Sequence, residues 1–240
     1  MATVNAAIAK TSIPVVTENS YFPYSYVKDD KVAGIYVDIV SELNQLMPDF
    51  EITLKPMSWR QGLQQVKTGK SPAILGTYYR GQDRKFVYPY SQTFAYERVV
   101  VICHPESNIK KGAKWPSDFA GKLITNVDGY DGWLDYKTRD KSITSIANFL
   151  EVPSVSVAWN MVNKNLVDCT LFEQQIWTIK QDTDPRASNL VKATNVTTEG
   201  VHVGFSNAAN IAENWPNLPI FRRQLDDAIY VYKKRRNVHF

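Results

Sequence analysis

The sequence predicts an α/β protein built of two lobes, and three observations lead to this fold class. Apolar runs of strand length alternate with amphipathic stretches of helix length, a pattern typical of parallel strands joined by crossover helices. This alternation is interrupted by a long β-branched run at residues 97–104 and then begins again. With 240 residues, the chain is long enough for two small domains. We therefore expect two α/β lobes joined where the chain crosses between them.

The first lobe takes its elements mainly from the first hundred residues. Strands are expected at residues 13–17, 51–57 and 73–75, and helices at residues 35–47 and 58–67. The first helix carries its apolar residues on one face, and Ser58 is a suitable N-cap for the second. The third strand is expected to end at Gly76, where a basic, polar turn follows.

The second lobe repeats the alternation. Strands are expected at residues 122–127, 154–157 and 169–172, and a helix at residues 159–164, with an apolar-faced stretch at residues 142–150. A return strand at residues 200–205 and a closing helix at residues 218–236 follow. The turn at residues 128–133 is expected to open another helix. Hinge strands near residues 96–98 and 199–201 divide the chain into lobe 1, residues 1–97 and 201–240, and lobe 2, residues 98–200.

Composition excludes several classes of function. The formal charge of +4 is small for this length, and its clearest cluster, residues 233–236, matches a solvated helix end rather than a nucleic-acid site. No apolar run approaches the length of a membrane-spanning helix. Met1 leads directly into polar sequence, so any export signal is expected to have been removed and Met1 added.

The cysteines and histidines are too few for a disulfide framework or a zinc site. Cys103 and Cys169 are either two buried thiols or one bridge within the second lobe. The three histidines, His104, His202 and His239, do not cluster with cysteines. We therefore expect neither a metal nor a cofactor.

Four sequence blocks occur in an order that resembles a known family. They are Glu18 to Tyr24, with an aromatic-x-Pro-aromatic pattern; Gly34 to Val40, with Gly-x-x-Val-Asp; Gly76 to Ser91, with an arginine ahead of Tyr-Ser; and Asn165 to Glu173. Together they resemble the solute-binding proteins of bacterial ABC importers, in the family that carries polar amino acids. The resemblance covers nearly the whole chain, and its strength lies in the order and spacing of the blocks.

The resemblance implies a fold, a location and partners. The fold would be that of type II periplasmic binding proteins, with two Rossmann-like lobes joined by two hinge crossings and a ligand in the cleft between them. The protein would be an extracytoplasmic or periplasmic monomer that captures a small zwitterion, such as an amino acid or a derivative. It would deliver this ligand to an ABC-transporter permease and would not be an enzyme.

The same resemblance assigns roles to residues that follow strands. Arg84 matches the arginine that binds the ligand's α-carboxylate, and its planar guanidinium suits that bidentate contact. Glu173 matches the acid that binds the α-ammonium group, although the family usually has aspartate there. Tyr21 and Trp59 match paired aromatic residues that enclose the ligand, and Glu18 matches an acidic position that faces its side chain.

The remaining ligand-binding positions are backbone or polar groups in turns. Gly76 would offer its carbonyl, Thr77 a backbone or hydroxyl group, and Gly129 and Tyr130 their backbone amides. Tyr79 stands where relatives usually have a small hydroxyl residue. Structural interpretations remain open: Glu173 as a surface ion-pair partner of Lys164 or Lys180, Trp59 and Tyr21 as packing residues, and Glu18 as a loop acid.

Two further polar residues receive structural expectations. We expect Arg80 to be a solvated surface charge; pointing inward, it would instead recruit a second carboxylate. Asp168 is expected to bond backbone rather than ligand.

Two other functions remain open. One is an enzyme of the same fold, similar to cyclohexadienyl dehydratase, in which Glu173 acts as general acid or base; its sign would be a second buried titratable group opposite Glu173. The other is the sensory ligand-binding domain of a receptor. Ligand identity stays open as well, because Glu18 favours a cationic or amide side chain, whereas Arg80 would favour an acidic one.

Overall fold

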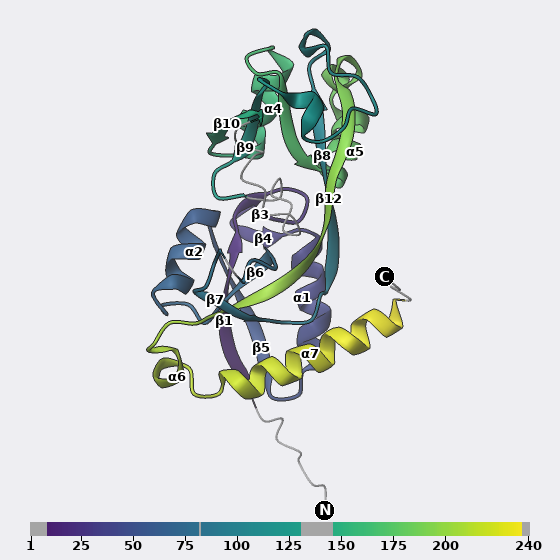
Figure 1. The fold of residues 1–240 in the computed structure, drawn as a ribbon. Helices are drawn as coiled ribbons and strands as arrows, with labels where there is room; N and C mark the ends of the chain where they lie inside the picture. Colours follow the sequence, from purple (N-terminus) through teal and green to yellow (C-terminus); the bar gives the residue numbers. More distant parts are fainter. Residues whose placement is uncertain (1–8, 82, 131–145, 237–240) are drawn as a thin grey trace, which may run out of the picture. The chain divides into compact units, whose positions relative to one another are not determined.

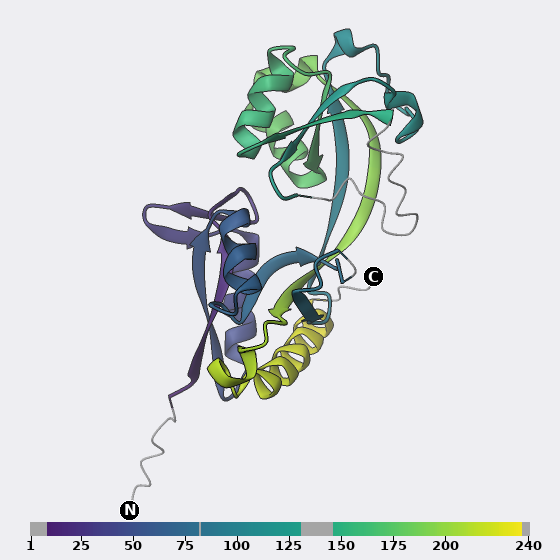
Figure 2. The ribbon, with the colours of Figure 1, turned by 60° about the vertical axis from the view of Figure 1, so that its left-hand side comes forward.

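The computed structural model describes residues 9–81, 83–130 and 146–236, and the chain divides into two compact units. Unit 1 comprises Met1–Asn19, Tyr24–Phe94 and His202–Phe240, whereas unit 2 comprises Ser20–Pro23 and Ala95–Val201. Both units are α/β, as the alternating pattern predicted (Figure 1). The chain passes between them along two long strands, β8 (Ala95–Cys103) and β12 (Val191–Ser206), which pair antiparallel and run side by side (Figure 2).

The sheet of unit 1 is built on three parallel strands. These are β1 (Thr11–Glu18), β5 (Phe50–Met57) and β6 (Ala73–Tyr78), with β1 in the centre. Val15 of β1 pairs with Leu54 on one side and with Ala73 on the other. The end of β12 joins the sheet beside β6, and β7 (Val87–Tyr90) pairs with it. A hairpin of β3 (Ser25–Lys28) and β4 (Lys31–Ala33) precedes the first helix.

The helices of unit 1 are α1 (Ile35–Leu46), α2 (Trp59–Lys67), α6 (Ile211–Asn214) and α7 (Leu218–Arg235), and α7 packs beside α1 (Figure 1). Ser58 caps α2 as predicted and forms a capping box with Gln61. Gly62 allows α2 to approach β1 closely, because a Cβ at this position would lie 2.6 Å from a methyl carbon of Val16. The start of α2, where Trp59 lies, is therefore fixed by a cap and by close packing.

Unit 2 has a sheet in the order β10-β9-β11-β8-β12. β9 (Leu123–Val127), β10 (Asn148–Val152) and β11 (Cys169–Glu173) are parallel, and β8 runs antiparallel to β11. Helices α4 (Val155–Asn163) and α5 (Gln174–Thr183) pack against one face, where Trp159 contacts Phe172 and Trp177. Short 3₁₀ turns at Pro105–Ser107, Ser117–Phe119 and Pro185–Asn189 complete the unit.

Several expected elements need correction. The strand expected at residues 154–157 is wrong: Ser154 caps α4, and its hydroxyl accepts the backbone N–H of Val157. Residues 155–157 form the partly exposed first turn of α4, whose buried residues are Ala158, Trp159 and Val162. The strand lies earlier, in β10, which overlaps the end of the apolar-faced stretch expected at residues 142–150. β6 also continues past Gly76 to Tyr78. The helix expected to open at residues 128–133 falls mostly outside the described residues.

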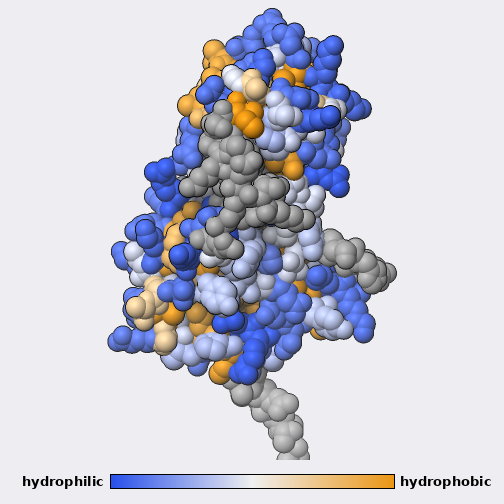
Figure 3. All heavy atoms as spheres, in the orientation of Figure 1, coloured by the Kyte–Doolittle hydropathy of each residue, from blue (hydrophilic) through white to orange (hydrophobic). Residues whose placement is uncertain are grey.

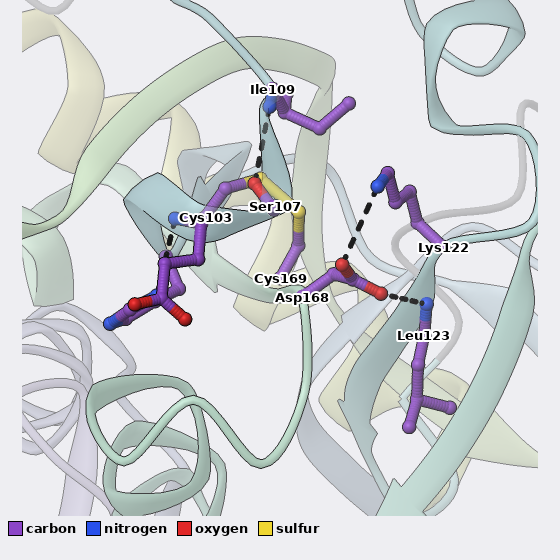
Figure 4. The surroundings of a disulfide bond; sticks show 9 residues. Cys103, Ser107, Ile109, Lys122, Leu123, Asp168 and Cys169 are labelled. Carbon is purple, nitrogen blue, oxygen red and sulfur yellow. Dashed lines mark hydrogen bonds and ion pairs between the residues drawn. A yellow bond between two sulfur atoms is a disulfide. The ribbon is translucent and has the colours of Figure 1, made fainter.

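A disulfide joins Cys103 at the end of β8 to Cys169 at the start of β11, so the second of the two alternatives for these cysteines is correct (Figure 4). Both cysteines are fully buried. Beside the bridge, Asp168 accepts the backbone N–H of Leu123 at 2.8 Å and lies 3.6 Å from the Lys122 ammonium (Figure 4). Asp168 therefore holds β11 to β9 and has the structural role predicted for it.

The face of the molecule drawn in Figure 3 is predominantly hydrophilic, with smaller hydrophobic areas between charged and polar residues. Within the described ranges, none of the helices combines the length and the apolar character needed to cross a membrane.

Candidate functional site

The predicted carboxylate-binding arginine lies in a buried cluster of cationic and aromatic residues in unit 1. Arg84 is 9% exposed, and its guanidinium carbon lies 5.6 Å from the centre of the Trp59 ring. The backbone turn from Arg80 to Arg84 is closed by a 2.7 Å hydrogen bond from the Arg84 N–H to the Arg80 carbonyl. Two predicted site residues from separate elements, α2 and the turn after β6, are thus brought together by cation–π contact.

Arg80 belongs to the same cluster, and the expectation that it is a solvated surface charge is wrong. The side chain is fully buried, with its guanidinium carbon 5.1 Å from the centre of the Tyr78 ring. Its Nη1 donates to the Tyr79 carbonyl at 3.0 Å. The basic turn looked polar in the sequence, but the Tyr78 ring lies over the guanidinium. Two arginines are therefore buried near one another, and we call Trp59, Tyr78, Arg80, Arg84 and Tyr90 the arginine cluster.

Tyr90 is a member of this cluster that the sequence did not indicate. Its hydroxyl accepts the backbone N–H of Arg80 at 3.1 Å, and its ring lies 5.0 Å from that of Tyr79, which is 55% exposed. Burial raises the pKa of Tyr90, while the hydrogen bond from Arg80 and the charges of Arg84 and Arg80 oppose the rise. Tyr90 thus holds the turn that carries both arginines.

Gly76 and Thr77 lie within β6 rather than after it. Gly76 has φ +85, a conformation that favours glycine, and a Cβ there would come 3.2 Å from the Tyr36 ring. Thr77 is fully buried, and its hydroxyl donates to the Tyr78 carbonyl at 3.0 Å. Glu18, the last residue of β1, is 7% exposed, and its backbone carbonyl accepts from the Ser25 hydroxyl.

In unit 2 the predicted ammonium-binding acid lies beside a second carboxyl group. Glu173 ends β11 and is 6% exposed, so it is not a surface ion-pair residue. It pairs in register with Val99 of β8, and Glu97, two residues earlier on β8, is 2% exposed. Because alternate residues of a strand share a face, Glu97 and Glu173 occupy diagonal positions on one face of the sheet. We call them the glutamate pair.

Glu97 was missed in the sequence because the β-branched run at residues 97–104 was interpreted only as the segment that carries the chain into the second lobe. The signal was present: strict alternation places Glu97 on the same face as Val99 and Val101. Burial, and next the charge of Glu173, raise the pKa of Glu97 well above its usual value, whereas a hydrogen bond from Tyr21 acts in the opposite direction. A carboxyl group so placed favours its protonated form.

Two tyrosines adjoin the glutamate pair. The Tyr21 hydroxyl donates to Glu97 Oε2 at 2.8 Å, and the Tyr21 and Tyr130 rings meet edge to face at 5.4 Å. Gly129 has φ +76 in the turn after β9, where the Tyr130 amide donates to the Val127 carbonyl at 2.8 Å. Tyr21, Tyr130 and Glu173, predicted separately, are thus connected through Glu97. Trp59, predicted to pair with Tyr21, belongs to unit 1.

Comparison with known proteins places the chain in a family. Residues 13–234 match the model for bacterial extracellular solute-binding proteins, family 3. The chain therefore belongs to family 3 of the bacterial extracellular solute-binding proteins, as the four sequence blocks predicted.

Solved structures share the fold at low sequence identity. An ancestral arginine-binding protein bound to arginine is 14% identical, with a TM-score of 0.74, covering 94% of this chain and 93% of that one. A histidine kinase sensor domain similar to periplasmic binding proteins is 13% identical, with a TM-score of 0.73 and coverages of 95% and 92%. A structure from work on glutathione import via GshT and the cystine ABC importer TcyBC of Streptococcus mutans is 16% identical, with a TM-score of 0.73 and coverages of 94% and 91%. The fold is thus that of type II periplasmic binding proteins.

Proposed function

We propose that this protein captures a small zwitterion, most simply an α-amino acid or a close derivative, outside the cytoplasm. The observation that carries the proposal is the opposite charge of two buried groups: Arg84 beside Trp59 in unit 1, and Glu173 in unit 2. An α-amino acid carries one group of each sign, and a guanidinium and a carboxylate are the side chains that bind a carboxylate and an ammonium group through charge-assisted hydrogen bonds.

The proposed contacts divide between the units. Arg84 binds the α-carboxylate, Trp59 packs on the ligand, and Glu18, Gly76, Thr77 and Tyr79 complete the contacts from unit 1. Glu173 binds the ammonium group, with Tyr21, Gly129 and Tyr130 beside it. Binding by residues of both units, with closure about β8 and β12, is part of this proposal.

Delivery to an ABC permease by a monomeric protein is the proposed physiological role. Membership of an extracellular family supports it, and so does the likeness to a structure from work on ABC import. The Cys103–Cys169 disulfide adds independent support for an extracytoplasmic location, because disulfides persist mainly in oxidising compartments.

A thermal-shift screen tests the function. Protein refolded from denaturant, which removes bound ligand, is screened against the twenty standard L-amino acids and small carboxylic acids. A ligand that binds only the folded protein raises the unfolding temperature, by an amount that grows with its concentration. Stabilisation by an amino acid supports the proposal, whereas stabilisation by carboxylic acids without an amino group contradicts the role of Glu173.

One observation favours an enzyme as the second candidate. The sign expected for a dehydratase was a second buried titratable group near Glu173, and Glu97 is such a group. A protonated carboxyl beside an ionised one can serve general acid–base chemistry. Incubation with a cyclohexadienyl carboxylate, followed by NMR, distinguishes the two: loss of water from the substrate would show an enzyme, and its unchanged recovery supports a binding protein.

A further inference from the structure

Hydrogen bonds in unit 1 tie together the two places where the chain passes to β8 and returns along β12. The Ser91 N–H donates to the Val203 carbonyl at 2.9 Å, and the Val203 N–H donates to the Ser91 hydroxyl at 2.9 Å. Next to Val203, His202 Nδ1 lies 2.7 Å from the Ser91 carbonyl oxygen. The Gln92 N–H donates to Asp226 Oδ1 at 2.7 Å, which attaches the segment to α7. All these residues belong to unit 1.

His202 is a member of this network whose ordinary pKa, 6.5, lies close to neutral pH. Because a carbonyl oxygen only accepts hydrogen bonds, the contact with Ser91 requires a proton on Nδ1. Nε2 lies 3.4 Å from the Thr93 hydroxyl, which can donate to it while the ring is neutral. The neutral ring therefore has a partner at each nitrogen.

The His202 ring also contacts the arginine cluster. It meets the Tyr90 ring edge to face, with the ring centres 5.8 Å apart. The Tyr90 hydroxyl accepts the Arg80 N–H at 3.1 Å, and the Arg80 carbonyl accepts the Arg84 N–H at 2.7 Å. His202 is thus connected through Tyr90 to the turn that carries Arg84.

We propose that neutral His202 is a positioning residue for the arginine cluster, and that acid weakens amino-acid binding by charging its ring. The inference rests on the proposed function and deepens it by giving the arginine site a pH dependence. The ring takes up its proton from solvent and returns it there, and no other bond forms or breaks.

The added proton acts in two ways. It converts Nε2 from an acceptor into a donor, so the Thr93 hydroxyl can no longer donate to it. It also places a positive charge on a half-buried ring near Lys233. Both effects favour movement of the ring out of its place. Tyr90 then loses the ring that packs against it, and the turn loses a fixed acceptor for the Arg80 N–H, so Arg84 is less well preorganised for a carboxylate.

The charged and titratable groups that face His202 are Asp226 and Lys233 on α7 and Tyr90 on β7. Burial, the largest effect, and the Lys233 charge lower the pKa of His202, whereas the Ser91 carbonyl and Asp226 act in the opposite direction. Burial raises the pKa of Asp226, so its attraction for a charged ring weakens in acid. Burial also raises the pKa of Tyr90, whose hydroxyl therefore stays protonated at neutral pH. The folded unit thus favours the neutral ring.

The Arg80 amide reports this coupling in the ligand-free protein. NMR of ¹⁵N-labelled protein between pH 5 and pH 8 follows the Arg80 amide and the His202 ring. We expect the two to titrate with the same midpoint, because Tyr90 links them. In Tyr90→Phe, which lacks the acceptor hydroxyl, His202 should still titrate while the Arg80 amide no longer follows it. An Arg80 amide that ignores His202 in the wild type, or follows it unchanged in Tyr90→Phe, would overturn the proposal.

Calorimetry at pH 8 and pH 5 measures the effect on binding. The probe is the amino acid with the largest shift in the thermal screen, and circular dichroism verifies that the protein is folded at both pH values. We expect the wild type to bind about fivefold more weakly at pH 5. His202→Asn, whose amide can still donate to the Ser91 carbonyl, should lose most of this difference.

His104 provides the matched control, because it lies in unit 2, where its Nδ1 accepts the Glu106 N–H. His104→Asn should keep the full pH dependence of the wild type. Equal affinity at both pH values in the wild type, or an undiminished difference in His202→Asn, would contradict the proposal and leave the proposed function standing. Failure of every amino acid to stabilise the protein would refute the function and with it the effect on binding, whereas the NMR titration decides the coupling in either case.

Discussion

The two units share an architecture, but the clusters of buried polar residues described in them differ: one contains two arginines and the other two glutamates. Unit 1 places Arg80 and Arg84 among aromatic rings in the turn after β6, whereas unit 2 places Glu97 and Glu173 on adjacent strands. The cationic side chains stack on ring faces, which stabilise positive charge. In unit 2, Glu97 accepts a hydrogen bond from the Tyr21 hydroxyl, which stabilises the ionised form of that carboxyl group. Under the proposed function, unit 1 would bind the carboxylate of a zwitterion and unit 2 its ammonium group.

The units also differ in how their chain is constrained. The Cys103–Cys169 bridge, with a sequence separation of 66, lies wholly within unit 2. Removing it in a Cys103→Ala/Cys169→Ala variant should lower the free energy of unfolding of unit 2 by about 4 kcal/mol, because the unfolded chain regains the entropy of a long open loop. Hydrogen exchange followed by mass spectrometry should show faster opening of β9 and β11 with little change in β1 and β5. An equal loss of protection in both units would contradict this division.

The arginine cluster gives the next largest expected effect. Arg84→Ala should weaken amino-acid binding by about 3 kcal/mol, roughly 100-fold, because a carboxylate would lose its charged partner in a buried place. The neighbouring Lys85 is exposed, so Lys85→Ala is the matched control and should bind as the wild type does. Isothermal titration calorimetry measures both variants. An affinity that Arg84→Ala leaves unchanged would remove Arg84 from the site.

Tyr90 tests whether the turn that carries the arginines depends on a single hydroxyl. Tyr90→Phe removes the acceptor of the Arg80 N–H and should lower the stability of unit 1 by about 1 kcal/mol. Tyr88→Phe is the control, because Tyr88 is 56% exposed in the same strand. Thermal unfolding compares the two variants. Equal unfolding temperatures would show that the turn is held by its backbone bonds alone.

Local sequence signals predicted much of the fold. The capping box at Ser58, the one-faced helix at residues 35–46 and the buried strands β1, β6 and β11 all follow from patterns within a few residues. The incorrect predictions of secondary structure have a different cause. Alternating serine and valine at residues 154–157 fit a strand, yet Ser154 is the N-cap of α4. The residue that packs against Trp177 and Phe172 is Trp159, further along the helix.

The candidate site was predictable only in part, because some of its residues depend on contacts outside their own sequence block. Arg84 and Glu173 stand in blocks with characteristic neighbours, and Trp59 follows an expected strand, so each was found one at a time. Glu97 acquires its importance from residues far along the chain, Glu173 and Tyr21. Arg80 is covered by Tyr78 and held by Tyr90, only ten residues on, but Tyr90 is placed by the pairing of β7 with β12. Burial of a charged side chain depends on those long-range contacts, which no local pattern contains.

The smallest expected effect contrasts the pH dependence of the units. In unit 1, the pKa of His202 is lowered, mainly by burial and also by the charge of Lys233. The hydrogen bond to the Ser91 carbonyl and the charge of Asp226 act in the opposite direction. The neutral ring is favoured by folding, so its contribution is complete above the ordinary value of 6.5 and is lost as the pH falls from there towards the lower folded value. Glu97 in unit 2 has a raised pKa, so its contribution is complete below 4.5 and is lost as the pH rises.

The two units should therefore respond to pH with opposite slopes. His202→Asn, whose amide can still donate to the Ser91 carbonyl, should flatten the loss of unit 1 stability below pH 6.5. Glu97→Gln should flatten the loss of unit 2 stability on the alkaline side. Hydrogen exchange between pH 5 and pH 8, corrected for the intrinsic exchange rate, reports each unit separately. The prediction fails if both variants change the pH dependence of the same unit, or if the two slopes have the same sign. Either outcome would mean that these charges do not act within their own units, and would remove an electrostatic argument for the proposed division of the ligand between them.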